Sequence, residues 1–134
     1  MVEDSESDAL LLVRELRTAG YDVQSTRVET PQDFRAALDA QPWSMVLCDY
    51  ALPGFNGLAA LRMFQEHHLD IPFIFVSGTI SEDLAVEAMR VGAQDYVMKS
   101  NLKRLVPAIE RELRDAVGRR EKHALLNEQR SRRN

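Results

Sequence analysis

The 134-residue sequence has one cysteine and no long hydrophobic run. Cys48 cannot form an intrachain disulfide, and we expect it to pack as a small hydrophobic side chain in a reducing compartment. No apolar run approaches the roughly 18 residues of a membrane span. The N-terminus is acidic from its third residue, which is unlike a secretory signal peptide. These absences predict a cytoplasmic protein with no membrane partner.

The sequence also lacks an excess of positive charge, because its formal net charge is −4. The charge is uneven. Residues 118–134 hold six basic and two acidic residues, whereas residues 1–117 hold eleven basic and nineteen acidic ones. An acidic body argues against nucleic acid as a partner of this domain. The short basic tail has no interleaved aromatic residues and is interpreted as a solvated helical extension or linker.

A continuous apolar run at 45–48 is followed directly by Asp49 and then by the turn-forming segment 53–57. Such a run is typical of a strand buried on both faces. A carboxylate is therefore expected at the carboxyl end of a strand, where open α/β sheets place their ligand sites. Taken alone, Asp49 could equally cap a turn.

Strand and helix patterns alternate along the chain. Strand-like segments are expected at 21–28, 45–48, 71–76 and 95–98, and a first strand would precede Glu3. Amphipathic helices lie between them, with Thr30-Pro31, Ser81 and Asn101 as starting signals. This order predicts an α/β fold in which a doubly wound five-stranded parallel sheet carries helices on both faces.

Polar residues follow the expected strand ends. Parallel strands bring their carboxyl ends to one edge, so these residues should converge there: Glu3, Asp4, Asp49, Ser77 and Lys99. Clustered carboxylates repel one another unless a cation or proton intervenes, and oxygen ligands suit Mg²⁺. A carboxylate nucleophile, a divalent cation, a lysine and a hydroxyl are the parts needed to transfer a phosphoryl group.

Residues 1–117 resemble the receiver domain of bacterial two-component response regulators, in the CheY-like superfamily. The resemblance rests on four motifs: Glu3-Asp4, Asp49–Gly57, Val76–Thr79 and Gly92–Lys99. It implies a flavodoxin-like sheet of order 2-1-3-4-5. It also implies a non-enzymatic signalling domain that catalyses only its own phosphorylation and dephosphorylation.

The resemblance implies a role for each site residue. Asp49 would accept the phosphoryl group from a sensor histidine kinase or phosphotransfer protein. Asp4, Asp49 and the backbone carbonyl of Ala51 would hold Mg²⁺, with Glu3 acting through a metal-bound water. Lys99 would pair with the phosphate or with Asp49. Two residues complete the expected switch: Ser77 and Tyr96. The switch would alter the surface of the fourth helix, fifth strand and fifth helix.

Each of these residues also has a simpler interpretation. Ser77 could merely end a strand, Tyr96 could be core, and Lys99 could be a surface lysine. An aspartyl-phosphate phosphatase is disfavoured, because such enzymes place a second aspartate two residues after the nucleophile, where Ala51 stands. A nucleotide-binding protein is disfavoured because no glycine-rich loop follows a strand. A receiver-like interaction module that is never phosphorylated remains an alternative.

Three features depart from the family pattern. Only Met1 and Val2 precede the acidic pair, so the first strand is expected to be truncated, through an artificial boundary or a misplaced start. Otherwise another chain would fill the gap, or the gap would be tolerated as a weakened core. Ser100 follows Lys99 where proline is common, and we expect a trans peptide bond there. The last helix should overrun the domain, as a dimerisation element or a connection to an output domain absent here. A homodimer could also form through the switch surface.

Overall fold

The computed structural model describes residues 1–78 and 81–133, and side chains are described as far as residue 128. Thr79 of the Val76–Thr79 motif and Asn134 lie outside the described residues, as do the side chains of the basic residues Arg130, Arg132 and Arg133.

The elements alternate along the chain as predicted. The helices are α1 (Glu6–Thr18), α2 (Pro31–Ala40), α3 (Gly57–Glu66), α4 (Glu82–Val91) and α5 (Leu105–Arg133). The strands are β1 (Val46–Cys48), β2 (Phe73–Ser77) and β3 (Asp95–Met98), and a 3₁₀ helix, η1 (Lys99–Arg104), precedes α5. No described helix is both long and apolar enough to cross a lipid bilayer.

The three strands form a parallel sheet in the order β1-β2-β3. Val2 makes isolated parallel bridges to Val28 on one side and to Cys48 on the other. The backbone therefore retains the predicted 2-1-3-4-5 order, and the doubly wound α/β class is confirmed.

The expectation of five strands is wrong, because the described residues form only three. The first strand is reduced to the bridging residue Val2. Segment 21–27, predicted as a strand, has no strand assignment, and only Val28 joins the sheet. Among the described residues, this segment makes only isolated backbone hydrogen bonds beside the sheet, such as the one that the Thr26 carbonyl accepts from the Met1 amino group, and such bonds do not form a ladder.

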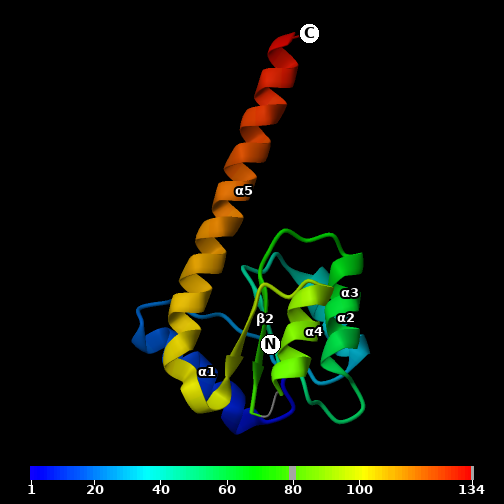
Figure 1. Cartoon of the computed structure of the whole chain (residues 1–134), viewed down its shortest axis with the longest axis vertical. Helices are drawn as coiled ribbons and strands as arrows, with labels where there is room; N and C mark the ends of the chain where they lie inside the picture. Colours follow the sequence, from blue (N-terminus) through cyan, green and yellow to red (C-terminus); the bar gives the residue numbers. More distant parts are fainter. Residues whose placement is uncertain (79–80, 134) are drawn as a thin grey trace.

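Side chains alternate between the two faces of the sheet. Val46, Cys48, Phe73 and Phe75 pack into one core cluster, which also takes in residues of α2, α3 and α4. On the other face, the intervening strand residues pack against α1 and α5, in a cluster of Leu47, Ile74, Val76, Leu12 and Ile109. Figure 1 shows α1 and α5 on one side of β2, and α2, α3 and α4 on the other.

The helix-start predictions are confirmed at two sites. Thr30 caps α2 by accepting a hydrogen bond from the Asp33 amide, and Pro31 is the first helical residue. Ser81 caps α4 through the Leu84 amide. The prediction that Asn101 caps the last helix is wrong. Asn101 lies inside η1 with φ −139° and ψ 59°, a kink that delays α5 to Leu105.

The last helix is long, as expected. Its first turns are buried against the sheet through Leu105, Ala108 and Ile109, Arg119 still contacts Asp70, and the last turns project away from the domain (Figure 1). The predicted boundary between a receiver at 1–117 and an extension at 118–134 falls inside this helix and stays a prediction.

Candidate functional site

Asp49 follows β1 directly and is buried at the carboxyl edge of the sheet. Its Oδ1 accepts a hydrogen bond from the Ser77 hydroxyl at 3.0 Å and another from the Ala51 amide at 3.1 Å. Its Oδ2 accepts one from the Lys99 ammonium at 3.0 Å. Asp49 is thus held by a hydroxyl, an amide and a cation from three segments, far more than a turn cap requires.

The loop after Asp49 is held close to the sheet by Gly57, which opens α3. A Cβ at this position would lie 2.8 Å from the Tyr50 Cα and 2.9 Å from the Phe75 ring. The Gly57 amide donates to the Tyr50 carbonyl at 3.1 Å. A side chain there would push the loop outward, so this glycine fixes the segment that follows the candidate acceptor.

Lys99 stands directly after β3 and contacts three carboxylates. Its Nζ lies 2.8 Å from Glu3 Oε2, 2.8 Å from Asp8 Oδ2 and 3.0 Å from Asp49 Oδ2. Burial alone would lower the pKa of Lys99, but hydrogen bonds to the acidic neighbours outweigh it and raise that pKa. Lys99 is therefore a permanent positive charge at neutral pH.

Glu3 is almost fully buried, with 1% of its surface exposed. Its Oε1 accepts the Ser5 amide at 3.1 Å, whereas no described donor completes a hydrogen bond to Oε2. Burial raises the pKa of Glu3, while the nearby Lys99 charge opposes that rise. A buried carboxylate oxygen with only an ion-pair contact is an available ligand for a cation.

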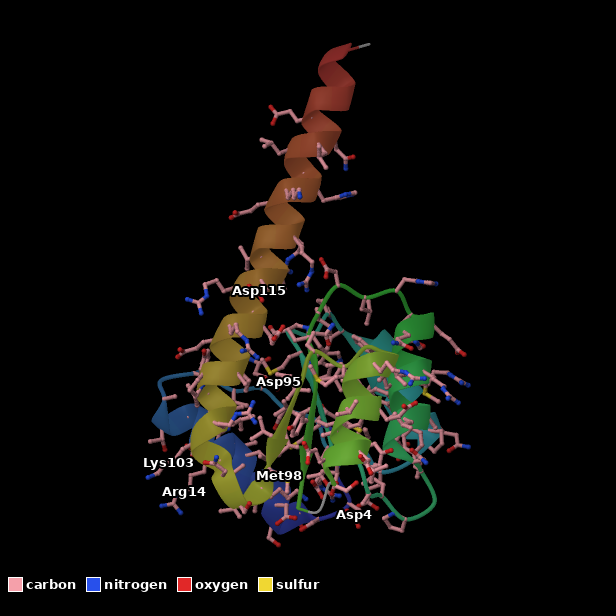
Figure 2. The ribbon with its side chains drawn as sticks, in the orientation of Figure 1. Asp4, Arg14, Asp95, Met98, Lys103 and Asp115 are labelled. Carbon is pink, nitrogen blue, oxygen red and sulfur yellow. The ribbon has the colours of Figure 1, made fainter. Side chains whose placement is uncertain are left out.

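An acidic trio lies at the same edge. One carboxylate oxygen from each of Glu3, Asp4 and Asp49 can be chosen so that all three lie within 4.8 Å of one another. Asp4 is exposed, so the trio opens to solvent. Figure 2 shows Asp4 at the end of the sheet where β3 finishes with Met98. Asp8, which contacts Lys99, adds a fourth carboxylate at this edge, and the oxygen donors of the trio fit a hard divalent cation.

The remaining predicted residues are placed differently. Ser77 ends β2, is buried and contacts Asp49 as expected. Ala51 is joined to Asp49 through its amide, while the role predicted for its carbonyl stays a prediction. Tyr96 does not join the cluster. It is half-buried on β3, with the Arg104 guanidinium 5.8 Å from its ring centre.

Asp8 was not among the site residues predicted from the sequence. This residue lies in the first turn of α1, one helical turn beyond Asp4, and its side chain reaches Lys99. Asp4 precedes Ser5, the cap of α1, so no helical spacing links it to Asp8, and the sequence carried no specific signal for this contact. Lys99–Ser100 is trans as expected, since the described residues contain no cis peptide bond.

Comparison with known proteins places these features in a family. The family model described as "Response regulator receiver domain" matches residues 1–110. The chain belongs to the response regulator receiver domain family, and such a domain serves in signalling.

Individual relatives agree with this assignment. The luminescence regulatory protein LuxO of Vibrio campbellii is 37% identical over 99 residues, which cover 74% of this chain and 21% of that protein. The chain thus spans about a fifth of the length of this curated relative. The receiver domain of a LuxO repressor protein from Vibrio parahaemolyticus superposes with a TM-score of 0.74 at 28% identity, covering 93% of this chain and 92% of that one. The BeF3-activated receiver domain of nitrogen regulatory protein C gives 0.66 at 31% identity, covering 85% and 91%.

Proposed function

We propose that this domain accepts a phosphoryl group on Asp49 from a phosphohistidine of a sensor histidine kinase or phosphotransfer protein, as part of a cytoplasmic two-component relay. The observation that carries the proposal is the placement of Asp49 between the Lys99 ammonium and the Ser77 hydroxyl, beside Glu3 and Asp4, the other members of the acidic trio. These are the groups that phosphoryl transfer to a carboxylate requires.

Mg²⁺ is the cation that fits the proposed reaction. The ligands would be Asp4, Asp49 and the Ala51 carbonyl, with Glu3 acting through a water molecule. Bound there, the ion would neutralise negative charge on the transferring oxygens. The excess of carboxylates over Lys99 supports this assignment, because a bound divalent cation would offset the repulsion among them.

The transfer itself balances without any other reactant. An Asp49 carboxylate oxygen forms a bond to phosphorus as the bond from phosphorus to the donor imidazole nitrogen breaks, and the imidazole retains that electron pair. Lys99 holds positive charge beside the accepting oxygen. The Ser77 hydroxyl now donates to Asp49, and it would donate instead to a phosphate oxygen after transfer.

The same movement would provide the switch. A dianion on Asp49 would draw Ser77 and Lys99 toward it, and Lys99 begins η1, which connects β3 to α5. The surface formed by α4, β3 and α5 would then repack, with Tyr96 changing its side-chain conformation. That surface would act on a partner or on an output domain. The exposed Val117, Leu125 and Leu126 of α5 also support a homodimer through this helix.

Intact mass after incubation with acetyl phosphate tests the proposal. With Mg²⁺ we expect a labile gain of one phosphoryl group, and none with EDTA or in Asp49→Asn. The exposed Asp22→Asn serves as the matched control and should gain the group normally. Absence of any gain in protein that circular dichroism shows to be folded would favour a phosphorylation-independent interaction module. A stable gain in Asp49→Asn would contradict the assignment of the acceptor.

A further inference from the structure

Asp8 is the outermost of the three carboxylates that contact the Lys99 ammonium. Its side chain is 38% exposed, whereas the side chains of Glu3 and Asp49 are 2% and 9% exposed. The Lys99 Nζ lies 2.8 Å from Asp8 Oδ2 and 3.0 Å from Asp49 Oδ2. A single ammonium group therefore separates an open carboxylate from the proposed phosphoryl acceptor.

The position of Asp8 is fixed by the start of α1. Its amide donates a hydrogen bond to the hydroxyl of Ser5, the cap of this helix, at 3.2 Å. Its carboxylate accepts one from Lys99, so the backbone and the side chain of Asp8 are both held. The Ser5 amide in turn donates to Glu3 Oε1 at 3.1 Å, which joins the start of this helix to the acidic trio. The charge of Asp8 thus stays beside the edge that holds Asp49.

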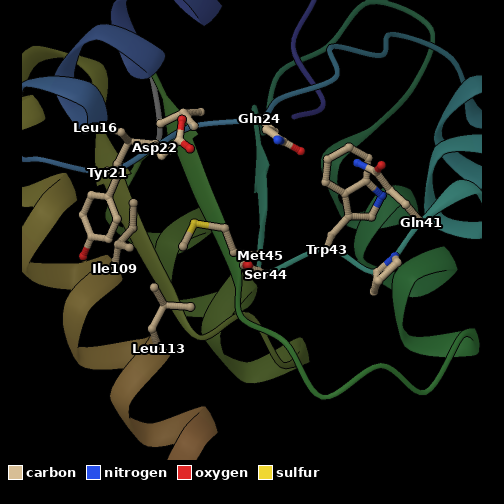
Figure 3. A pocket seen from close by; sticks show the side chains of 12 residues that line it. Leu16, Tyr21, Asp22, Gln24, Gln41, Trp43, Ser44, Met45, Ile109 and Leu113 are labelled. Atoms are coloured by element: carbon tan, nitrogen blue, oxygen red, sulfur yellow. The ribbon is translucent and has the colours of Figure 1, made fainter.

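A cavity of about 320 Å³ lies at the other end of the sheet from Asp49, and Figure 3 shows its lining. The lining side chains come from segments 21–24 and 41–45 and from α1 and α5, and none belongs to the acidic trio or to Lys99. This cavity therefore gives no route to Asp49. A phosphoryl donor has to approach at the carboxyl edge, where the side chains of Asp4 and Asp8 meet solvent.

The cluster at this edge carries more negative than positive charge, because Lys99 lies among four carboxylates: Glu3, Asp4, Asp8 and Asp49. The buried Glu3 Oε2 completes no hydrogen bond with a described donor, which points to a cation held by the trio. Such a cation would offset much of the excess, but Asp8 lies outside the trio and keeps its charge toward solvent. An edge of this kind attracts a positively charged group and repels an anion.

We propose that Asp8 makes this site select phosphoryl donors with a positively charged leaving nitrogen over anionic acyl phosphates. The favoured class holds phosphoramidate and protonated phosphoimidazoles such as phosphohistidine, and the inference rests on the proposed phosphorylation of Asp49. In either class, a bond forms from an Asp49 oxygen to phosphorus as the bond to the leaving group breaks, and the ammonia, imidazole or carboxylate that leaves keeps the electron pair. A protonated nitrogen leaves as a neutral group, so Asp8 acts on the approach and binding of the donor.

The test compares two small donors on the full chain at saturating Mg²⁺ and constant ionic strength. Phosphoramidate carries a protonated nitrogen near neutral pH, whereas acetyl phosphate is a dianion. Intact mass against time gives a second-order rate constant for each donor, and the ratio of the two constants is the readout. Asp8→Asn should lower the ratio of phosphoramidate to acetyl phosphate at least about threefold, because one unit of charge beside the donor is removed. Damage to folding or to Mg²⁺ binding slows both donors alike and leaves this ratio unchanged.

Two variants serve as controls for the charge and the position of Asp8. Asp8→Glu keeps the charge and should retain the wild-type ratio of rate constants. Asp22→Asn removes a carboxylate that lines the cavity of Figure 3, at the other end of the sheet, and should leave the ratio unchanged. Added NaCl should bring the wild-type ratio toward that of Asp8→Asn, because salt screens exposed charges.

Other results would decide against the inference. An unchanged ratio in Asp8→Asn would overturn the selection by Asp8, even with Asp49 phosphorylated by both donors. An equal fall of the ratio in Asp22→Asn would assign the selection to the net charge of the chain. Loss of phosphorylation by both donors in Asp8→Asn would make Asp8 a group that the reaction requires, not one that selects a donor. No gain from either donor in the wild type would contradict the proposed phosphorylation itself, so the two proposals fail by different results.

Discussion

The two ends of β3 carry ionic clusters of opposite character. At the amino end, Asp95 is buried and accepts hydrogen bonds from Arg104 at 3.2 Å and from Arg111 at 2.6 Å. Arg111 also lies 3.4 Å from Glu112, so two cations meet two carboxylates. At the carboxyl end, Lys99 alone meets Glu3, Asp8 and Asp49. Figure 2 shows Asp95 and Met98 at opposite ends of this strand.

The difference separates a charge-balanced cluster from the cluster at the proposed phosphorylation site. A balanced cluster is complete within the chain and only holds β3 against α5. An unbalanced cluster keeps an unfavourable excess of negative charge, which a bound cation would relieve. A clear loss of stability on removing Asp95 and only a small change on removing Asp49 would be the signature of this difference.

The largest expected effect is on Asp95. Asp95→Ala removes an acceptor shared by two arginines and by the Tyr96 amide, and should lower the free energy of unfolding by about 2–3 kcal/mol. The side chains of Arg104 and Arg111 are about half exposed and can hydrate, which keeps the loss below the upper range for a buried pair. Urea unfolding measures it.

Asp49→Ala is the matched substitution at the other end. Removing one of the crowded carboxylates relieves repulsion but leaves Ser77 and the Ala51 amide without an acceptor, so stability without divalent cations should change by less than about 1 kcal/mol. Asp95→Ala should still accept a phosphoryl group, whereas Asp49→Ala should not. Similar losses of stability at both ends would erase the distinction between the clusters.

Mg²⁺ should stabilise the folded domain only through the carboxylates at the carboxyl end of β3. At a hundred times its dissociation constant, the ion should raise the free energy of unfolding by about 2.7 kcal/mol. Thermal unfolding at matched ionic strength, with Na⁺ replacing Mg²⁺, separates binding from screening. Asp4→Asn and Asp49→Asn should lose the gain, and Asp95→Asn should keep it. A full gain in Asp49→Asn would place the ion elsewhere.

The pH dependence of stability should trace to Glu3. Burial raises the pKa of Glu3 above its ordinary 4.5, so the native state binds more protons than the unfolded state between that value and the raised one. Stability without divalent cations should therefore fall as pH rises through this window, by at most about 1.4 kcal/mol per unit.

Glu3→Gln should remove this part of the slope, and the exposed Glu6→Gln should not. Urea unfolding at several pH values up to neutrality measures both variants. Identical slopes of unfolding free energy against pH in the wild type and in Glu3→Gln would show that Glu3 has the same pKa in the native and unfolded states.

The sequence predicted most of the site because its residues follow strand ends. Asp49, Ser77 and Lys99 come directly after buried runs, and parallel strands must bring such positions together. Asp8 escaped prediction because its contact with Lys99 joins a helix to a residue 91 positions away. Tyr96 lies on the predicted strand 95–98, now β3. Its predicted change of side-chain conformation would be a difference between two states of the domain, so it stays a prediction.

The α/β class of the fold and the order of strands in the sheet were predicted from the sequence, but the number of strands was not. The alternation of segment 21–28 is a genuine strand pattern, yet a strand forms only where a neighbour completes its ladder. Val28 has that neighbour in Val2 and joins the sheet, whereas residues 21–27 have no strand assignment. Propensity alone could not reveal this dependence on a pairing partner.

The smallest expected effect is on Asp8. Its side chain is 38% exposed, so its pairing with Lys99 is partly screened, and Asp8→Asn should change stability by less than about 1 kcal/mol. Lys99 would keep Glu3 and Asp49 as partners, and the lifetime of the aspartyl phosphate should change by less than about tenfold. The rate of phosphoryl loss, followed by intact mass, measures this effect. Complete loss of phosphorylation, as expected for Asp4→Asn, would instead make Asp8 part of the cation site rather than a residue that positions Lys99.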